Sequence, residues 1–149
     1  MNSGGGTLDA CTIVDNLAGS AGAVRHASGT THMRNCIVRN NFDYSTGLEA
    51  NWSGLVSNGA RYNCTTPSIG TACQTGDPGL RRLGGAAGLG YPPGDYRLNP
   101  GSPCIDNGEN QAWMAGALDL RLQPRIYNGT VDIGAIEWYP PEGTRMILR

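Results

Sequence analysis

Five residues in the last third of the chain carry groups suited to acid/base chemistry: Asp106, Asp119, Arg125, Asp132 and Glu137. Paired carboxylates can act on a glycosidic bond, one as general acid and the other as base or nucleophile. The same residue types can instead close a structure, because an arginine fork binds carboxylates through parallel hydrogen bonds. We interpret Asp119, Arg125, Asp132 and Glu137 as a structural clasp that holds the last strand, with catalysis as the alternative.

A second group of ionisable residues lies in the first forty positions and supplies weak candidates for catalysis: Asp9, Asp15, His26, His32, Arg34 and Arg39. The histidines flank a Gly/Thr-rich turn, and no Ser or Cys nucleophile stands in a recognisable frame around them. We therefore expect solvated loop histidines. The acids and arginines are the best candidates for the lining of a polar groove.

The elements that position these residues are predicted to be short strands. Apolar or β-branched runs are broken every few residues by Gly, Asn, Asp or Pro, and only residues 110–118 favour a short helix. Residues 8–16 (Leu-Asp-Ala-Cys-Thr-Ile-Val-Asp-Asn) align with residues 33–41 (Met-Arg-Asn-Cys-Ile-Val-Arg-Asn-Asn) at a spacing of 25. A period in the twenties is typical of a solenoid. We expect residues 8–14 and 33–38 to pair as parallel strands with Cys11 above Cys36; two unrelated hairpins are the alternative.

The five cysteines favour structural uses. Cys64 and Cys73 enclose a Thr/Pro/Ser/Gly loop, so we expect a disulfide between them in an oxidising compartment. Cys104 is expected to be a buried free thiol. No Cys-x-x-Cys pair occurs and neither histidine is near a cysteine cluster, so no metal site and no cofactor are predicted.

Composition excludes several classes of function. All 11 positively charged residues are Arg, which excludes lysine chemistry such as Schiff-base formation. The net charge is −1 and the arginines are scattered, so no nucleic-acid partner is expected. No apolar run reaches the roughly 20 residues that span a bilayer. The N-terminal Met-Asn-Ser-Gly-Gly-Gly lacks the features of a signal peptide, which indicates a piece of a longer secreted protein or a fragmentary gene.

Five stretches in the second half resemble the C-terminal region of bacterial right-handed parallel β-helix surface proteins, the choice-of-anchor type related to polymorphic outer-membrane repeats. They are Tyr-Asn-Cys-Thr-Thr-Pro (62–67), Asp-Pro-Gly-Leu (77–80), Gly-Asp-Tyr-Arg-Leu (94–98), Gly-Ser-Pro-Cys-Ile-Asp-Asn-Gly (101–108) and Val-Asp-Ile-Gly-Ala-Ile-Glu (131–137). Where the family often has Asp-Leu-Asp-Gly-Asn-Pro-Arg, this chain has Asp-Leu-Arg-Leu-Gln-Pro-Arg (119–125), without the glycine of the turn.

The resemblance and the repeat together imply an all-β fold, a short right-handed parallel β-helix (a pectate-lyase-like solenoid) with an irregular Pro/Gly-rich C-terminal cap. Coils are expected over residues 1–76, the last coil and cap of the same domain over 77–138, and a tail over 139–149. A solenoid exposes an apolar cross-section at an uncovered end, so we expect the cap to cover the C-terminal end and the N-terminal coil to favour self-association.

The function implied is that of a non-catalytic, secreted or cell-surface module that contributes to adhesion, glycan contact or envelope architecture. The alternative is the C-terminal part of a carbohydrate-active enzyme, a polysaccharide lyase or glycoside hydrolase. Lyases on this scaffold use acids with Ca²⁺ and an Arg or Lys base on one exposed face. Only under that alternative would Ca²⁺ be expected here. Fold alone does not decide between the two.

Overall fold

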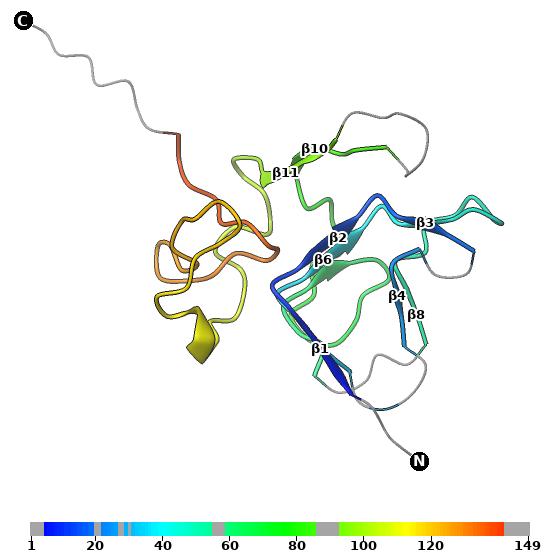
Figure 1. The fold of residues 1–149 in the computed structure, drawn as a ribbon, viewed down its shortest axis with the longest axis horizontal. Coiled ribbons are helices and arrows are strands. Elements are labelled where there is room, and N and C mark those ends of the chain that lie inside the picture. Colours follow the sequence, from blue (N-terminus) through cyan, green and yellow to red (C-terminus); the bar gives the residue numbers. More distant parts are fainter. Residues whose placement is uncertain are drawn as a thin grey trace, which may run out of the picture.

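The computed structural model describes residues 5–19, 22–26, 29, 31–54, 59–85 and 93–141, and this part of the chain is all-β (Figure 1). Its strands are short: β1 (Gly6–Asp9), β2 (Thr12–Val14), β3 (Leu17–Ala18), β4 (Val24–Arg25), β5 (Thr31–Arg34), β6 (Ile37–Arg39), β7 (Phe42–Asp43), β8 (Trp52–Ser53), β9 (Cys64–Thr65), β10 (Leu80–Arg82) and β11 (Asp95–Leu98). The helix predicted over 110–118 is reduced to one 3₁₀ turn, η1 (Ala112–Met114), since Gly116 leaves helical geometry with φ +75°.

The repeat of the first forty residues forms parallel pairs. Strands β1, β2 and β3 lie beside β5, β6 and β7, with Leu8 opposite Met33 and Thr12 opposite Ile37. The predicted parallel pairing of residues 8–14 with 33–38 is therefore confirmed. Strand β8 pairs with β4, and β9 adds a third strand beside β6, with Cys64 opposite Ile37 (Figure 1).

The corners between these strands repeat as well. Ala10 and Asn35 follow matched strands and both have positive φ, 52° in each case. Asp15 and Asn40 occupy the next matched corner, with φ values of 59° and 54°. Asn and Asp adopt this left-handed region more readily than other residues with a side chain, which explains three of the four residue types. One corner geometry thus serves two successive turns of the chain.

A ladder of asparagines joins neighbouring layers through their side chains. Asn16 donates its side-chain N–H to Asn41 Oδ1 over 2.8 Å, and Asn41 donates in the same way to Asn51 Oδ1 over 3.1 Å. The same two oxygens accept the backbone N–H groups of Asn16 and Asn41. Asn51 continues the ladder by donating to the Thr66 carbonyl over 2.8 Å. Buried amide groups that are fully hydrogen-bonded fix the register of stacked strands without the cost of an unpaired polar group.

The central strand β6 is buried on both of its faces. Cys36 and Val38 point into one apolar cluster with Met33, whereas Ile37 points the opposite way, into a second cluster. Alternation along a strand sends successive side chains to opposite faces of the sheet. The second cluster contains Ile133 from the C-terminal part of the chain, so this face is covered by a segment outside the parallel strands β1–β9, which we call the stack.

That cover is the irregular C-terminal segment, which packs against the side of the stack. Ala135 donates its backbone N–H to Thr12 Oγ1 over 3.0 Å, and Gly134 donates to the Asn35 carbonyl over 2.8 Å. A Cβ at Gly134 would come within 2.8 Å of Ile37, so glycine permits this approach. Figure 1 shows residues 100–138 beside β1, β2 and β6. The sequence placed this cap at the end of the coils, and the observed contacts are lateral instead.

Strands β10 and β11 form an antiparallel hairpin between the stack and this lateral cap. Leu80 lies opposite Leu98, and Arg82 lies opposite Asp95. The apolar side of the hairpin joins the second cluster, where Leu98 is buried and Leu80 packs against it. The hairpin therefore holds its arginines outward while its leucines attach it to the core.

Candidate functional site

The four residues predicted to form a clasp lie together and are buried. The exposed fractions are 2% for Arg125, 2% for Glu137, 1% for Asp132 and 6% for Asp119. Arg125 Nη1 lies 3.1 Å from Glu137 Oε1, an ion pair whose angle is not that of a hydrogen bond, and Nη2 donates to the Gly134 carbonyl. The guanidinium of Arg125 thus connects the loop that ends at this residue to the segment that contains Gly134 and Glu137.

The carboxylates of this cluster bind backbone N–H groups of the turns around them. Asp119 accepts from Arg121 over 2.7 Å, from Gln123 over 2.9 Å and, through its other oxygen, from Glu137 over 3.0 Å. Asp132 accepts from Asp106 over 2.7 Å and from Trp138. Asp106 itself is exposed and stands outside the cluster. The acids are therefore occupied by turns of the chain, in a closed arrangement.

Three carboxylates share one guanidinium in this buried place, and the pKa values of two of them, Asp132 and Glu137, are raised. Burial raises the pKa of Glu137 to about 8, with the neighbouring Asp132 charge acting in the same direction and Arg125 opposing it. Burial also raises the pKa of Asp132 to about 6, opposed by the N–H groups of Asp106 and Trp138. The cluster consequently holds protons near neutral pH.

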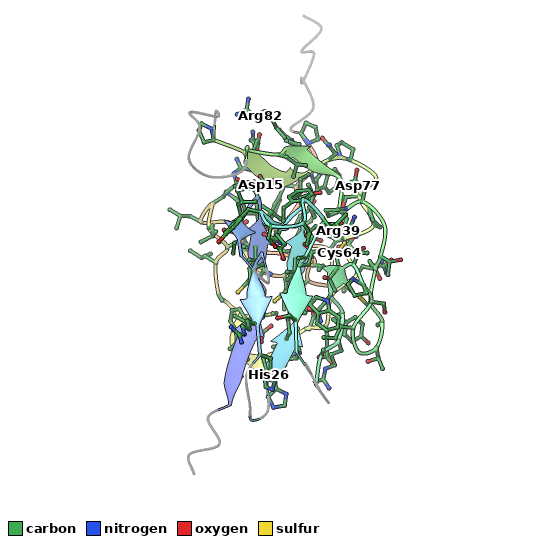
Figure 2. All side chains as sticks on the ribbon, turned by 90° about the vertical axis from the view of Figure 1, so that its right-hand side faces the viewer. Asp15, His26, Arg39, Cys64, Asp77 and Arg82 are labelled. Carbon is green, nitrogen blue, oxygen red and sulfur yellow. The ribbon has the colours of Figure 1, made fainter. Side chains whose placement is uncertain are left out.

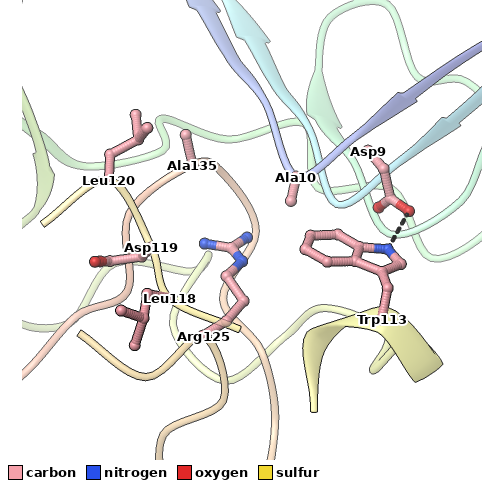
Figure 3. Close-up of a pocket in the computed structure, with 8 residues that line it drawn as sticks. All are labelled: Asp9, Ala10, Trp113, Leu118, Asp119, Leu120, Arg125 and Ala135. Carbon is pink, nitrogen blue, oxygen red and sulfur yellow. Dashed lines mark hydrogen bonds between the residues drawn. The ribbon is translucent and has the colours of Figure 1, made fainter. Parts of the chain in front are cut away.

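An open pocket of about 180 Å³ lies between the stack and the lateral cap, next to this cluster (Figure 3). Its lining consists of Asp9, Ala10, Trp113, Leu118, Asp119, Leu120, Arg125 and Ala135. Trp113 is 51% exposed and donates its indole N–H to Asp9 Oδ2 over 3.2 Å. Three polar atoms of the lining residues, Asp9 Oδ1, Arg125 Nε and Arg125 Nη1, are buried and have no hydrogen-bond partner among the described residues. We call this the Trp113 pocket.

A chain of polar contacts fixes the Asp9 side of the pocket. Arg34 Nη2 lies 3.3 Å from Asp9 Oδ2, and Arg34 Nη1 donates to Gln111 Oε1 over 2.9 Å. Gln111 donates to Glu109 Oε2 over 2.7 Å, and Arg61 donates to the same oxygen over 2.6 Å. Asp9, Arg34 and Arg61 are ladder neighbours in successive layers, so the regular spacing of the strands presents them as one row.

Asp15 and Arg39 lie on other parts of the stack and serve local contacts. Asp15 Oδ2 accepts the backbone N–H of Gly84 over 2.6 Å, which ties the end of β2 to the chain after β10. Arg39 Nε lies 3.4 Å from Glu49 Oε1, and its Nη1 donates to the Thr75 carbonyl over 2.7 Å. Neither residue lines the Trp113 pocket. The predicted groove of two acids and two arginines is thus divided, and only Asp9 and Arg34 come together.

The two histidines occupy another part of the chain. His26 Nδ1 shares a hydrogen bond of 2.7 Å with Thr31 Oγ1, and His32 is exposed on β5. Figure 2 shows His26 at the end of the molecule opposite Asp15. No described acid is hydrogen-bonded to either ring, and the Thr31 hydroxyl is the described partner of His26.

The disulfide expected between Cys64 and Cys73 is not formed, and all five cysteines are free thiols. Cys64 lies opposite Gln74 in a parallel bridge, so Cys73 is one residue out of register and its side chain points to the other face. The thiol of Cys64 instead contacts that of Cys104, which is buried as expected, and Cys11 contacts Cys36 across the first two layers. Figure 2 shows Cys64 beside Arg39 on the stack.

Comparison of the chain with known family models, curated proteins and solved structures finds no match. The described residues contain no group of three or more His, Cys, Asp or Glu side chains placed to hold a metal ion. They also contain no apolar helix of the length that a bilayer requires.

Sequence reasoning selected Asp9, Arg34 and Arg125 as candidates, whereas for Trp113, which gives the pocket its aromatic wall, it favoured a packing role over stacking on a sugar. Trp113 and Asp9 are 104 residues apart, and no local pattern connects them. The signal that was present is the spacing of 25 between Asp9 and Arg34, which puts outward-facing residues of successive strands in one row.

Proposed function

We propose that the chain is a short right-handed parallel β-helix with a lateral cap, and that it acts as a non-catalytic, secreted or cell-surface module that contacts glycans in the Trp113 pocket. Three features support the β-helix: parallel pairs at an offset of 25 residues between β1–β3 and β5–β7, corners that repeat their left-handed geometry, and the asparagine ladder. Each is typical of a chain that winds past itself in successive layers.

The observation that carries the glycan proposal is the set of groups in the Trp113 pocket. Half of the Trp113 surface is exposed, and an indole face stacks well on the apolar face of a sugar ring. The carboxylate of Asp9 belongs to the lining of the pocket and supplies an acceptor for a sugar hydroxyl. An aromatic wall with a few polar groups that orient the ligand is the usual composition of a small-molecule site.

The occupation of the acids supports binding without turnover. Asp119 and Asp132 accept backbone N–H groups of their own turns, and Glu137 pairs with Arg125. A glycosidase instead needs two carboxyl groups facing a substrate across roughly 5–10 Å. The six weak catalytic candidates of the N-terminal part are distributed over several regions, and each acid among them has a structural contact.

A glycan array tests the proposal, followed by titration of the best ligand into the purified chain. Trp113→Ala should weaken binding about 5–30-fold, because stacking on one aromatic ring contributes about 1–2 kcal/mol. Tyr44→Ala is the matched control, since Tyr44 is an exposed aromatic residue outside the pocket. Binding that survives Trp113→Ala, or an array without any ligand, would contradict the proposal. Release of reducing ends from a bound polysaccharide would favour the carbohydrate-active enzyme instead.

A further inference from the structure

A second cavity, distinct from the Trp113 pocket, lies between the β10–β11 hairpin and the lateral cap. Its volume is about 310 Å³, and its lining consists of Arg81, Arg97, Arg121, Gln123, Tyr139, Pro140 and Pro141. The three arginines come from three separate segments: β10, β11 and the loop that follows Asp119. We call this the arginine cavity.

The positive charge around this cavity is only partly balanced. Arg97 is held by Asp95, to which its Nε donates over 2.7 Å. The pKa of Asp95 falls to about 2, mainly through that bond and with a further contribution from Arg81. The guanidinium groups of Arg81 and Arg121 form no hydrogen bond or ion pair with another described residue. The lining itself contains three guanidinium groups and no carboxylate, which favours an anionic ligand.

The opposite wall of the cavity is rigid and largely apolar. Tyr139 donates its hydroxyl to the Pro124 carbonyl over 3.0 Å, and its ring centroid lies 4.2 Å from that of Tyr127. Pro140 and Pro141 continue this wall. The cavity therefore combines fork-shaped donors on one side with a fixed ring face on the other.

We propose that the arginine cavity binds a sugar that carries a carboxylate. A guanidinium fork matches the two oxygens of a carboxylate, and the forks of Arg81 and Arg121 have no partner among the described residues. A cavity of about 310 Å³ holds more than one small inorganic anion, and the ring of Tyr139 suits the apolar face of a sugar. The inference does not depend on the Trp113 pocket, because the two cavities share no lining residue.

The test is calorimetric titration with a panel of tetrasaccharides containing glucuronate, galacturonate or mannuronate, each beside its carboxyl-reduced form. At least one acidic member should bind, and its neutral form should bind at least tenfold more weakly. Arg81→Gln and Arg121→Gln should each weaken binding about tenfold, since a hydrogen bond to a charged group contributes about 1.5–3 kcal/mol. Added salt should weaken it further. Arg25→Gln, at an exposed arginine on β4, is the control and should leave binding unchanged.

Three results would overturn the inference. The first is that no acidic tetrasaccharide binds more tightly than about 1 mM. The second is binding that survives the double variant Arg81→Gln/Arg121→Gln, with a melting curve showing that the variant is folded. The third is inorganic phosphate binding as tightly as the best tetrasaccharide with the same dependence on these arginines, which would make the cavity a simple oxyanion site. If Trp113→Ala loses binding while Arg81→Gln and Arg121→Gln bind as tightly as the parent, the ligand occupies the Trp113 pocket instead.

Discussion

Removal of the Arg125 side chain should destabilise the protein strongly at alkaline pH. Among the described residues Arg125 is the one guanidinium in contact with Glu137, and Asp119 and Asp132 lie in the same buried cluster. Loss of one partner from a buried ion pair leaves an uncompensated charge and typically costs about 3–5 kcal/mol. For a protein of this length each kcal/mol shifts the melting temperature by about 2–4 °C, so Arg125→Ala should lower it by about 6–20 °C.

The size of this effect should depend on pH in a definite direction. Glu137 has a pKa of about 8 and Asp132 a pKa of about 6, so both are ionised only above pH 8. At about pH 9 the variant must either keep Asp132 and Glu137 charged without the guanidinium or protonate them against the pH, so the loss is greatest. At about pH 5 both groups are protonated to a large extent, and the variant should lose much less.

The assay is a set of melting curves at both pH values for the parent and three variants. Arg125→Met retains most of the side-chain volume without the charge, so it separates the electrostatic loss from the cavity that alanine creates. Arg121→Ala, an exposed arginine in the neighbouring loop, is the control and should change stability by no more than about 0.5 kcal/mol. An alkaline midpoint for Arg125→Ala that equals the control's would refute the clasp and return its acids to the catalytic candidates.

Three further predictions concern other buried groups. The folded pKa of Glu137, about 8, lies above its unfolded value of 4.5, so its contribution to stability is present below pH 4.5 and is lost as pH rises through 8; Glu137→Gln should flatten the melting temperature over this range. Asn41→Ala should lower the free energy of unfolding by about 2 kcal/mol or more, measured by urea denaturation, because it leaves buried partners of the ladder unpaired. Oxidised glutathione should join Cys64 to Cys104 by thiol–disulfide exchange, in which it is itself reduced to two molecules of glutathione. Peptide mapping should then find a bond from Cys64 to Cys104 and none from Cys64 to Cys73.

The sequence predicted the parallel strands because their signal is local. Leu8 and Met33 stand at equivalent places in two copies of one pattern, and each copy ends in an asparagine that later joins the ladder. Position along the period therefore fixed both the register and the inward or outward direction of each side chain.

The lateral position of the cap and the two cavities could not be predicted in this way. Ile37 meets Ile133 through a contact that spans most of the chain, and no periodicity connects the two. Cys64 illustrates the same difficulty at short range: its nearness in sequence to Cys73 suggested a bond, whereas the strand register turned the two thiols apart. Contacts between irregular segments depend on how the whole chain packs.

The lateral cap also changes how the protein should unfold. In an array whose layers touch only their neighbours, the terminal layers can melt independently of the rest. Here one segment binds Thr12 in the first layer, Asn35 and Ile37 in the second and Cys64 in the third. Detachment of any one of these layers exposes part of the surface that the cap buries. Because the cap contacts all three layers, no layer can separate without breaking its contacts with the cap. The stack and its cap should therefore melt in one cooperative transition.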